Sequence, residues 1–231
     1  MRTVAVKFAI PLALALVALP APAQEAAPDV LLAAVARELI VALHQERNLP
    51  PGSQPKVAEL VETRVLPLFD FTHMTRIAVA RSWRLASPEQ QQSLTAEFKT
   101  LLVRTYSSIL SSYSDQVIEF KPLRAAAGVS EVTVKSEMKQ SGREPMAIDY
   151  DMQKTDVGWK VNDIKLAGVS LVTTYRASFA DEVRGGGVAG LIKSLSDKNR
   201  NAEAGAKPHS SLREISLRVY AFVHGALQHA K

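Results

Sequence analysis

The chain has 231 residues, of which 47% are hydrophobic, and it carries a formal net charge of +5 at pH 7. It contains no cysteine, so disulfides, thiolate catalysis and cysteine-ligated metals are excluded, and stability must come from apolar burial. The basic residues are mixed with acidic ones and do not cluster with aromatic residues, which argues against a nucleic-acid-binding protein.

The N-terminus has the pattern of a secretory signal peptide over residues 1–23. Arg2 and Lys7 precede an uncharged run over residues 8–19, and small residues suited to signal peptidase end at Ala23. The run is too short for a membrane span. We expect cleavage after Ala23, which removes two positive charges and leaves a soluble, exported protein of net charge +3.

Apolar residues at helical spacing dominate the first half of the mature chain. They predict helices over Asp29–Gln45, Pro55–Leu66, Phe71–Ala80 and Ser87–Tyr113. The apolar side of the first helix is expected to start at Val30. The last helix has a clear start, because Ser87 can cap it, Pro88 suits its first turn and Gln90 completes a capping box.

After this helix the period changes from helical to alternating. About four strands are expected, over Val117–Leu123, Val129–Gln140, Pro145–Thr155 and Gly158–Leu166. The second and third place apolar residues on one face and polar ones on the other, as in an antiparallel sheet covered by helices on one side. Helices Leu171–Val183 and Val188–Leu195 follow, so the order helices, strands, helices indicates an α+β fold.

The stretch between Trp159 and Phe179 is the most informative part of the chain. It alternates as a strand, changes phase before Ile164, and carries apolar residues at helical spacing after Gly168. Strand is therefore expected to pass into helix with almost no loop, and one apolar surface should run along both. That surface is either an ordinary core or the lining of a cavity for an apolar ligand.

The reactive residue types form no constellation suited to catalysis, metal binding or cofactor binding. Gly185–Gly190 matches a dinucleotide motif in letters, but it follows a helix where that motif requires a strand, so we expect a glycine break between helices. The five histidines lack metal-ligand spacing. Asp149 and Asp151 lie on the polar face of a strand, as a solvated pair does. We therefore expect a protein that is not an enzyme and uses no cofactor or metal.

The chain ends in a segment of different character. Residues 24–198 are expected to form one domain, and residues 199–231 a polar linker followed by a C-terminal amphipathic helix. The polar character already begins at Asp197, and apolar residues recur at helical spacing between Leu212 and Ala226. This last helix could pack on the domain, contact a partner or lie on a membrane surface.

Seven fragments of the chain carry a family resemblance through their order and spacing. They are Phe69–Arg76, Trp83–Gln91, Leu102–Ser107, Tyr150–Met152, Trp159–Val161, Gly168–Val172 and Tyr175–Phe179. Together they resemble the periplasmic phospholipid-binding MlaC family, also called the toluene-tolerance auxiliary family, over about Val30 to Lys198. Three positions depart: Ala80 replaces a glycine, Asn162 an aromatic residue and Ala167 an acidic residue.

The resemblance implies a twisted antiparallel sheet wrapped by helices around a deep apolar pocket for phospholipid acyl chains. It implies a periplasmic carrier that shuttles lipid between an outer-membrane lipoprotein–porin complex and an inner-membrane complex of an MCE protein, permease and ATPase, and so maintains outer-membrane lipid asymmetry. The residues expected to contact lipid are apolar positions of the sheet and of the helices beside it: Met74, Leu102, Tyr106, Leu110, Val132, Val134, Ile148, Tyr150, Met152, Trp159, Val161, Ile164, Val169, Val172, Tyr175 and Phe179.

Two other functions remain open on the residues alone. Another soluble carrier of apolar cargo, such as a lipoprotein chaperone, would need the same apolar lining. An enzyme acting on a hydrophobic substrate would need a buried acid or histidine facing the pocket, and the apolar positions of the predicted strands supply none. Taken singly, each lining residue is more often part of a core, so the resemblance favours a pocket for the set only.

Overall fold

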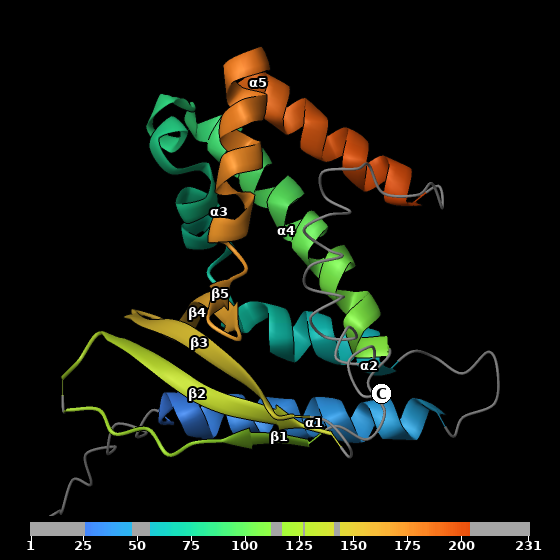
Figure 1. The fold of residues 1–231 in the computed structure, drawn as a ribbon, viewed down its shortest axis with the longest axis vertical. Coiled ribbons are helices and arrows are strands. Elements are labelled where there is room, and N and C mark those ends of the chain that lie inside the picture. The colour runs from blue at the N-terminus through green and yellow to red at the C-terminus, as the bar shows by residue number, and fades with distance from the viewer. Residues whose placement is uncertain (1–25, 48–55, 112–116, 127, 141–143, 204–231) are drawn as a thin grey trace, which may run out of the picture.

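The computed structural model describes residues 26–47, 56–111, 117–126, 128–140 and 144–203, and the structural statements below concern these residues (Figure 1). The predicted signal peptide and the C-terminal helix predicted beyond Leu212 lie outside the described residues.

Helices and an antiparallel sheet occupy different parts of the described chain, which confirms the α+β prediction. The helices are α1 (Pro28–Arg47), α2 (Lys56–Leu60), α3 (Phe71–Val79), α4 (Pro88–Ser111) and α5 (Arg176–Glu203). Shorter helical turns are η1 (Val61–Val65), η2 (Leu66–Leu68), η3 (Ala80–Leu85) and η4 (Thr173–Tyr175). The strands are β1 (Val117–Phe120), β2 (Glu131–Lys139), β3 (Met146–Thr155), β4 (Gly158–Leu166) and β5 (Val169–Ser170). In Figure 1, α1 runs beside β1 and β2, whereas α3 and α5 gather beyond the opposite edge of the sheet.

The helix starts are set by local hydrogen bonds that the sequence already encodes. The Ser87 hydroxyl accepts a hydrogen bond from the Gln90 backbone N–H at 3.2 Å, and the Gln90 side-chain oxygen accepts one from the Ser87 N–H at 3.0 Å. This reciprocal pair confirms the predicted capping box. Asp70 caps α3 in the same manner, because its carboxylate accepts from the His73 N–H at 2.8 Å.

The described strands form one antiparallel meander in the order β1-β2-β3-β4-β5. The sequence predicts four of them and misses β5, which is only two residues long. The phase change within β4 has a simple cause: Asp151 pairs with Asp163 while Met152 pairs with Val161, so Asn162 is the extra residue of a β-bulge. The bulge lets residues before and after it keep their apolar side chains on one face.

A tight turn separates β4 from β5. Ala167 and Gly168 both have positive φ values, 46° and 82°, as the two central residues of a type I′ hairpin turn require. The prediction that strand passes into helix with almost no loop is therefore wrong, because this hairpin and η4 intervene before α5 begins at Arg176.

The predicted single apolar surface is also wrong, since the buried side chains fall into two clusters. A sheet cluster contains Leu32, Val134, Met152 and Val161, with partly buried side chains around it. A helical cluster is formed mainly by α3, α4, η4 and α5 and centres on Leu94, Phe98, Tyr175, Phe179 and Leu191. Only Phe69 among the described residues packs against both clusters. The separation arises because the β4–β5 hairpin turns the chain away from the sheet.

Helix α5 bends back on itself at the glycine run, which confirms the predicted glycine break. Gly187 has a non-helical φ of 65°, and beyond it Ser194 and Lys198 donate hydrogen bonds to the Glu182 carboxylate at 2.9 and 3.2 Å. The helix then continues to Glu203, past the point where the sequence predicts a linker. Asn199 is the reason, because its buried side-chain amide donates to the backbone oxygen of Glu97 at 3.0 Å and so docks this end on α4.

Helix α1 buries the predicted apolar side except at its first residue, Val30. Leu32 and Val35 are buried, whereas Val30 is 59% exposed. Within the described residues, no helix combines the length and apolar character that crossing a bilayer requires.

Candidate functional site

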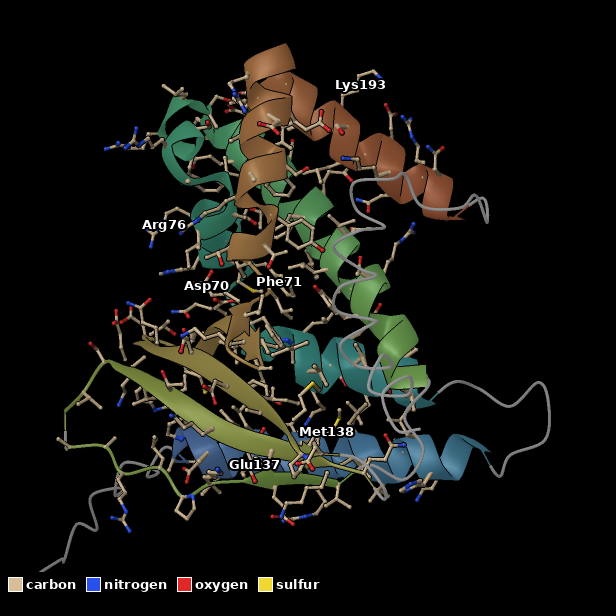
Figure 2. The ribbon with its side chains drawn as sticks, viewed as in Figure 1. Asp70, Phe71, Arg76, Glu137, Met138 and Lys193 are labelled. Carbon is tan, nitrogen blue, oxygen red and sulfur yellow. The ribbon has the colours of Figure 1, made fainter. Side chains whose placement is uncertain are left out.

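The apolar face of the sheet is the first part of the candidate site. Its register brings side chains of neighbouring strands together in rows: Val132 lies opposite Met152, Val134 opposite Tyr150, and Met138 opposite Met146. Figure 2 shows Met138 near the end of the sheet that α1 crosses. Val134 and Met152 are buried, but several neighbours are only partly so, which leaves apolar area for a further contact.

The partly buried members of the sheet cluster come from five segments of the chain. They are Leu68, Phe69, Phe120, Leu123, Val132, Tyr150, Trp159 and Ile164. The rings of Phe120 and Tyr150 stack with centroids 5.9 Å apart. Large apolar side chains that stay partly accessible beside buried ones are typical of a ligand-binding surface and uncommon in a close-packed core.

A cavity of about 560 Å³ opens at one end of this cluster. Leu123, Val132 and Trp159 belong both to its wall and to the sheet cluster, so the apolar face continues into it. The remaining wall comes from the start of α1, the loop after β1 and the β3–β4 turn: Ala27, Pro28, Asp29, Ala125, Ala126, Gly128, Val129, Ser130, Lys154, Thr155 and Asp156. Its volume lies within the range of small-molecule sites, roughly 300 to 1,000 Å³.

The cavity wall is held by hydrogen bonds between distant segments. The Asp29 carboxylate accepts from the Leu123 backbone N–H at 3.0 Å, and the Lys154 N–H donates to the Ser130 carbonyl at 2.7 Å. These contacts fasten the start of α1 to the loop after β1, and the loop before β2 to β3. Lys154 and Asp156 are exposed in this wall, whereas Pro28 is buried and Leu123, Val132 and Trp159 are partly buried.

The helical cluster, in contrast, is packed as a core. The Phe98 ring meets Tyr175 and Phe179 edge to face, with centroids 5.1 and 5.2 Å away. All three side chains are almost fully buried, as are Leu94 and Leu191. Close aromatic packing without accessible area stabilises a fold and leaves no surface for a ligand.

The structure divides the predicted lipid-contact residues between these two clusters. In the sheet cluster lie Val132, Val134, Tyr150, Met152, Trp159, Val161 and Ile164. In or against the helical cluster lie Met74, Leu102, Tyr106, Val172, Tyr175 and Phe179. Ile148 is buried outside both clusters, and Val169, which is 58% exposed on β5, also belongs to neither. The side chain of Leu110 lies outside the described residues.

Sequence reasoning missed several residues of the sheet cluster. Leu32, Leu68, Phe69, Phe120 and Leu123 come from α1, η2, β1 and the loop after β1. The alternation of Ile118 and Phe120 was a usable signal for β1. Leu68 and Phe69 had no such signal, because the Asp70 N–H donates to the Val161 carbonyl at 2.9 Å and places them beside β4 by a tertiary contact.

Buried polar groups meet where β4 faces the helical cluster. Asp163 is buried on the strand face opposite Ile164, and its carboxylate accepts from the Val172 N–H at 3.3 Å. Burial raises the pKa of Asp163, against the lowering effect of its hydrogen bonds. Burial also raises the pKa of Tyr106, and the neighbouring Tyr175 adds to the rise. The Tyr106 hydroxyl is buried and makes no hydrogen bond of good geometry among the described residues.

These groups do not form a catalytic arrangement in the apolar cavity. Asp163 is not part of the cavity wall, and its carboxylate is used by backbone N–H groups. Asp151, on the polar face, pairs with Lys165 at 2.6 Å and accepts from the Thr133 hydroxyl at 2.8 Å. Within the described part of the chain, no three histidine or acidic side chains gather as metal ligands.

Similarity to known proteins extends over most of the described domain. Among solved structures, the chain is similar to a phospholipid-binding protein from Ralstonia solanacearum, which was solved in complex with a phospholipid. The two share 37% sequence identity with a TM-score of 0.67, and the similarity covers 76% of this chain and 98% of that one.

A second relative and a family model agree with this. The toluene tolerance protein Ttg2D of Pseudomonas putida is 27% identical over 104 residues, which are 45% of this chain and 48% of that protein, so the match spans about half of its length. The model of the family described as MlaC protein matches residues 33–197. The resemblance found in the sequence is thereby confirmed, and with it the prediction that this protein is not an enzyme. The chain belongs to the MlaC family.

Proposed function

We propose that this protein is an exported phospholipid carrier that holds acyl chains against the sheet cluster and its cavity. The observation that carries the proposal is the 37% identity, over 76% of this chain, to a protein solved with a phospholipid bound. The apolar cavity wall of Leu123, Val132 and Trp159 supports it from the chain itself.

The energetics of a soluble lipid carrier explain why such a site must be apolar and sheltered. Exposing the roughly thirty methylenes of two acyl chains to water costs on the order of 20 kcal/mol at about 0.8 kcal/mol each. A carrier must offset most of this cost, but it must also release its cargo, so strong polar contacts are not needed. Met138, Met146 and Met152 are flexible enough to accommodate chains of different shape.

The positions of the charged residues in the cavity wall are also consistent with a phospholipid carrier. Lys154 and Asp156 are exposed members of the cavity wall, and a headgroup beside them would remain in water. Because both signs of charge are present there, we expect weak selection of headgroups by charge. This chemistry favours a carrier of phospholipids in general over a receptor for one lipid.

We propose further that the carrier works in the periplasm. It would shuttle lipid between an outer-membrane lipoprotein–porin complex and an inner-membrane MCE/ABC transporter complex, and so maintain outer-membrane lipid asymmetry. The signal-peptide pattern of residues 1–23 and the family support this. Sequencing the N-terminus of the exported protein tests the location, and residue 24 is the expected start.

Native mass spectrometry of gently purified protein tests lipid binding. We expect a mass increase that matches phospholipid and disappears on organic extraction. Val132→Asp places a charge in the cavity wall and should abolish the bound mass, whereas Val157→Asp, at a turn position that is 79% exposed, should retain it. Leu123→Trp narrows the cavity without adding charge and should reduce occupancy in a folded protein. Bound acylated peptide in place of phospholipid would favour a lipoprotein chaperone and refute the proposal.

A further inference from the structure

The turn η3 presents an apolar tip beside two cations. Within it, Arg81 and Arg84 are exposed, Trp83 is partly buried, and Leu85 is 78% exposed. Arg76 lies one turn earlier on α3, and Figure 2 shows it projecting from the outer side of that helix. We call Arg76, Arg81, Trp83, Arg84 and Leu85 the arginine turn.

The exposure of Leu85 is built into the local structure. The side-chain amide of Gln91, from α4, donates to the backbone oxygens of Trp83 at 3.1 Å and Ala86 at 3.3 Å. The Ala86 N–H also donates to the Trp83 oxygen at 3.3 Å. These bonds satisfy the carbonyls at the end of the turn and fix its backbone, in which Ala86 is buried and the preceding Leu85 points outward.

The chain segment that carries the arginine turn is cationic, and two acids of α5, which contacts η3, are paired: Asp181 with Arg184 and Glu182 with Lys198. Between Asp70 and Glu89 the sequence contains three arginines and no acidic residue. Arg176, from the start of α5, adds a fourth, because its guanidinium donates to the Ile77 carbonyl at 2.9 Å. The nearest acids along the chain are already engaged: Asp70 caps α3, and Glu89 accepts a hydrogen bond from the Ser87 hydroxyl at 2.7 Å.

Other exposed apolar side chains differ from Leu85 in the charge of the residue that precedes them. Val30 directly follows Asp29, and Val157 directly follows Asp156. Among the large apolar side chains exposed in the described residues, Leu85 alone directly follows an arginine. The pairing of an apolar tip with adjacent cations is therefore local to η3.

We propose that the arginine turn docks the protein on the surface of an anionic lipid bilayer. Arginine binds phosphate through several N–H donors, and each cation near an anionic membrane surface adds attraction. Leu85 would enter the interfacial layer, where a short apolar tip is favoured, while Trp83 packs against the helical cluster and holds the turn in place. This docking surface is separate from the lipid cavity, since none of its residues lines that cavity.

Vesicle flotation of the full-length protein tests the proposal. Vesicles of phosphatidylcholine alone are compared with vesicles that also contain phosphatidylglycerol. We expect binding to the anionic vesicles only, weakening as salt is added. The double variant Arg81→Gln/Arg84→Gln should bind about 30-fold more weakly. Leu85→Ser should weaken binding about tenfold, because it removes the apolar contact but no charge.

A control variant separates this surface from net charge. Arg124→Gln/Lys135→Gln removes the same number of charges from exposed positions near the sheet and should leave vesicle binding unchanged. Equal losses in the two double variants would overturn the proposal, as would equal binding to both kinds of vesicle or no binding to either. Thermal unfolding of each variant confirms that it is folded, and lipid occupancy by native mass spectrometry, measured in parallel, reports on the cavity independently.

Discussion

The carboxylate of Asp163 accepts a hydrogen bond from the Val172 N–H at 3.3 Å, which joins β4 to the turn that leads into α5. Asp163 is only 6% exposed, so its charge is held in a poorly hydrated place. The contact connects the strand of the sheet cluster to a residue of the helical cluster.

This position predicts a pH dependence of stability. Burial raises the pKa of Asp163 in the folded state above its value of about 3.9 in the unfolded chain. Folding therefore favours the protonated form, and the stability from this group falls as pH rises from the unfolded pKa through the folded one. Asp163→Asn keeps an oxygen acceptor without charge. We expect it to be at least as stable as wild type at neutral pH, with the advantage lost in acid.

Urea unfolding over a pH series measures this effect. Asp163→Ala is the control, because it leaves the Val172 N–H without its acceptor and should be less stable than Asp163→Asn at every pH. A constant difference between wild type and Asp163→Asn across the series would show that the charge of Asp163 has no part in it.

Ala80 stores backbone strain that glycine would relieve. Its φ of 54° and ψ of −123° lie in a region that suits glycine, and this is the position where the family resemblance leads us to expect one. Ala80→Gly should raise the free energy of unfolding by about 1 kcal/mol, since the relief exceeds the entropy that glycine adds to the unfolded chain. Ala96→Gly, on the exposed side of α4, should lower it by about 1 kcal/mol. Denaturation midpoints that move in the same direction for both variants would contradict this account.

The capping box at the start of α4 is expected to contribute to the stability of the fold. Ser87→Ala removes the acceptor of the Gln90 N–H and should cost about 1 kcal/mol in the free energy of unfolding. Ser93→Ala lies inside the same helix, where alanine is the better helix former, and should be neutral or slightly stabilising. Thermal unfolding of the two variants, made in parallel, measures the difference. Equal effects would mean that the cap contributes nothing beyond helix propensity.

The buried hydroxyl of Tyr106 is expected to be removable without loss of stability. Because it makes no hydrogen bond of good geometry, Tyr106→Phe should leave the free energy of unfolding unchanged or raise it slightly. Thr75→Val is the matched control: the buried Thr75 hydroxyl donates to the Phe71 carbonyl at 2.6 Å, and its removal should cost about 1 kcal/mol. A comparable loss for Tyr106→Phe, measured by urea unfolding, would reveal a hydrogen bond to the nearby Tyr175.

The features that could be predicted from sequence are those with local physical causes. The capping box of Ser87 and Gln90 depends on residues three apart, and strand alternation depends on a period of two. The phase change in β4 was visible, and the structure explains it by the bulge at Asn162. Of the three departures from the family, Ala80 and Ala167 occupy positive-φ positions. Glycine at the first and an acidic residue at the second suit those conformations better than alanine.

The features that could not be predicted from sequence are those that depend on tertiary contacts. The two residues of β5 exist as a strand only because a tight turn returns them to Lys165 and Leu166. The same turn sends Val172 into a core separate from that of Val161. A helical or alternating period reports which residues share a face, but it cannot report whether two faces meet. For this reason sequence reasoning could not foresee that the predicted lipid-contact residues fall into two clusters, and it overlooked Leu68 and Phe69.

The order of strands has a consequence for how the chain assembles. Each strand pairs with its neighbour in sequence, so the sheet can form as soon as residues 117–170 are available. The helical cluster must wait longer, because Phe98 needs Tyr175 and Phe179, which lie beyond the whole sheet in sequence. Loop closure over that distance makes its completion a late step. A chain that is threaded across a membrane from its N-terminus would therefore finish its sheet before α5 arrives to cover Leu94 and Phe98.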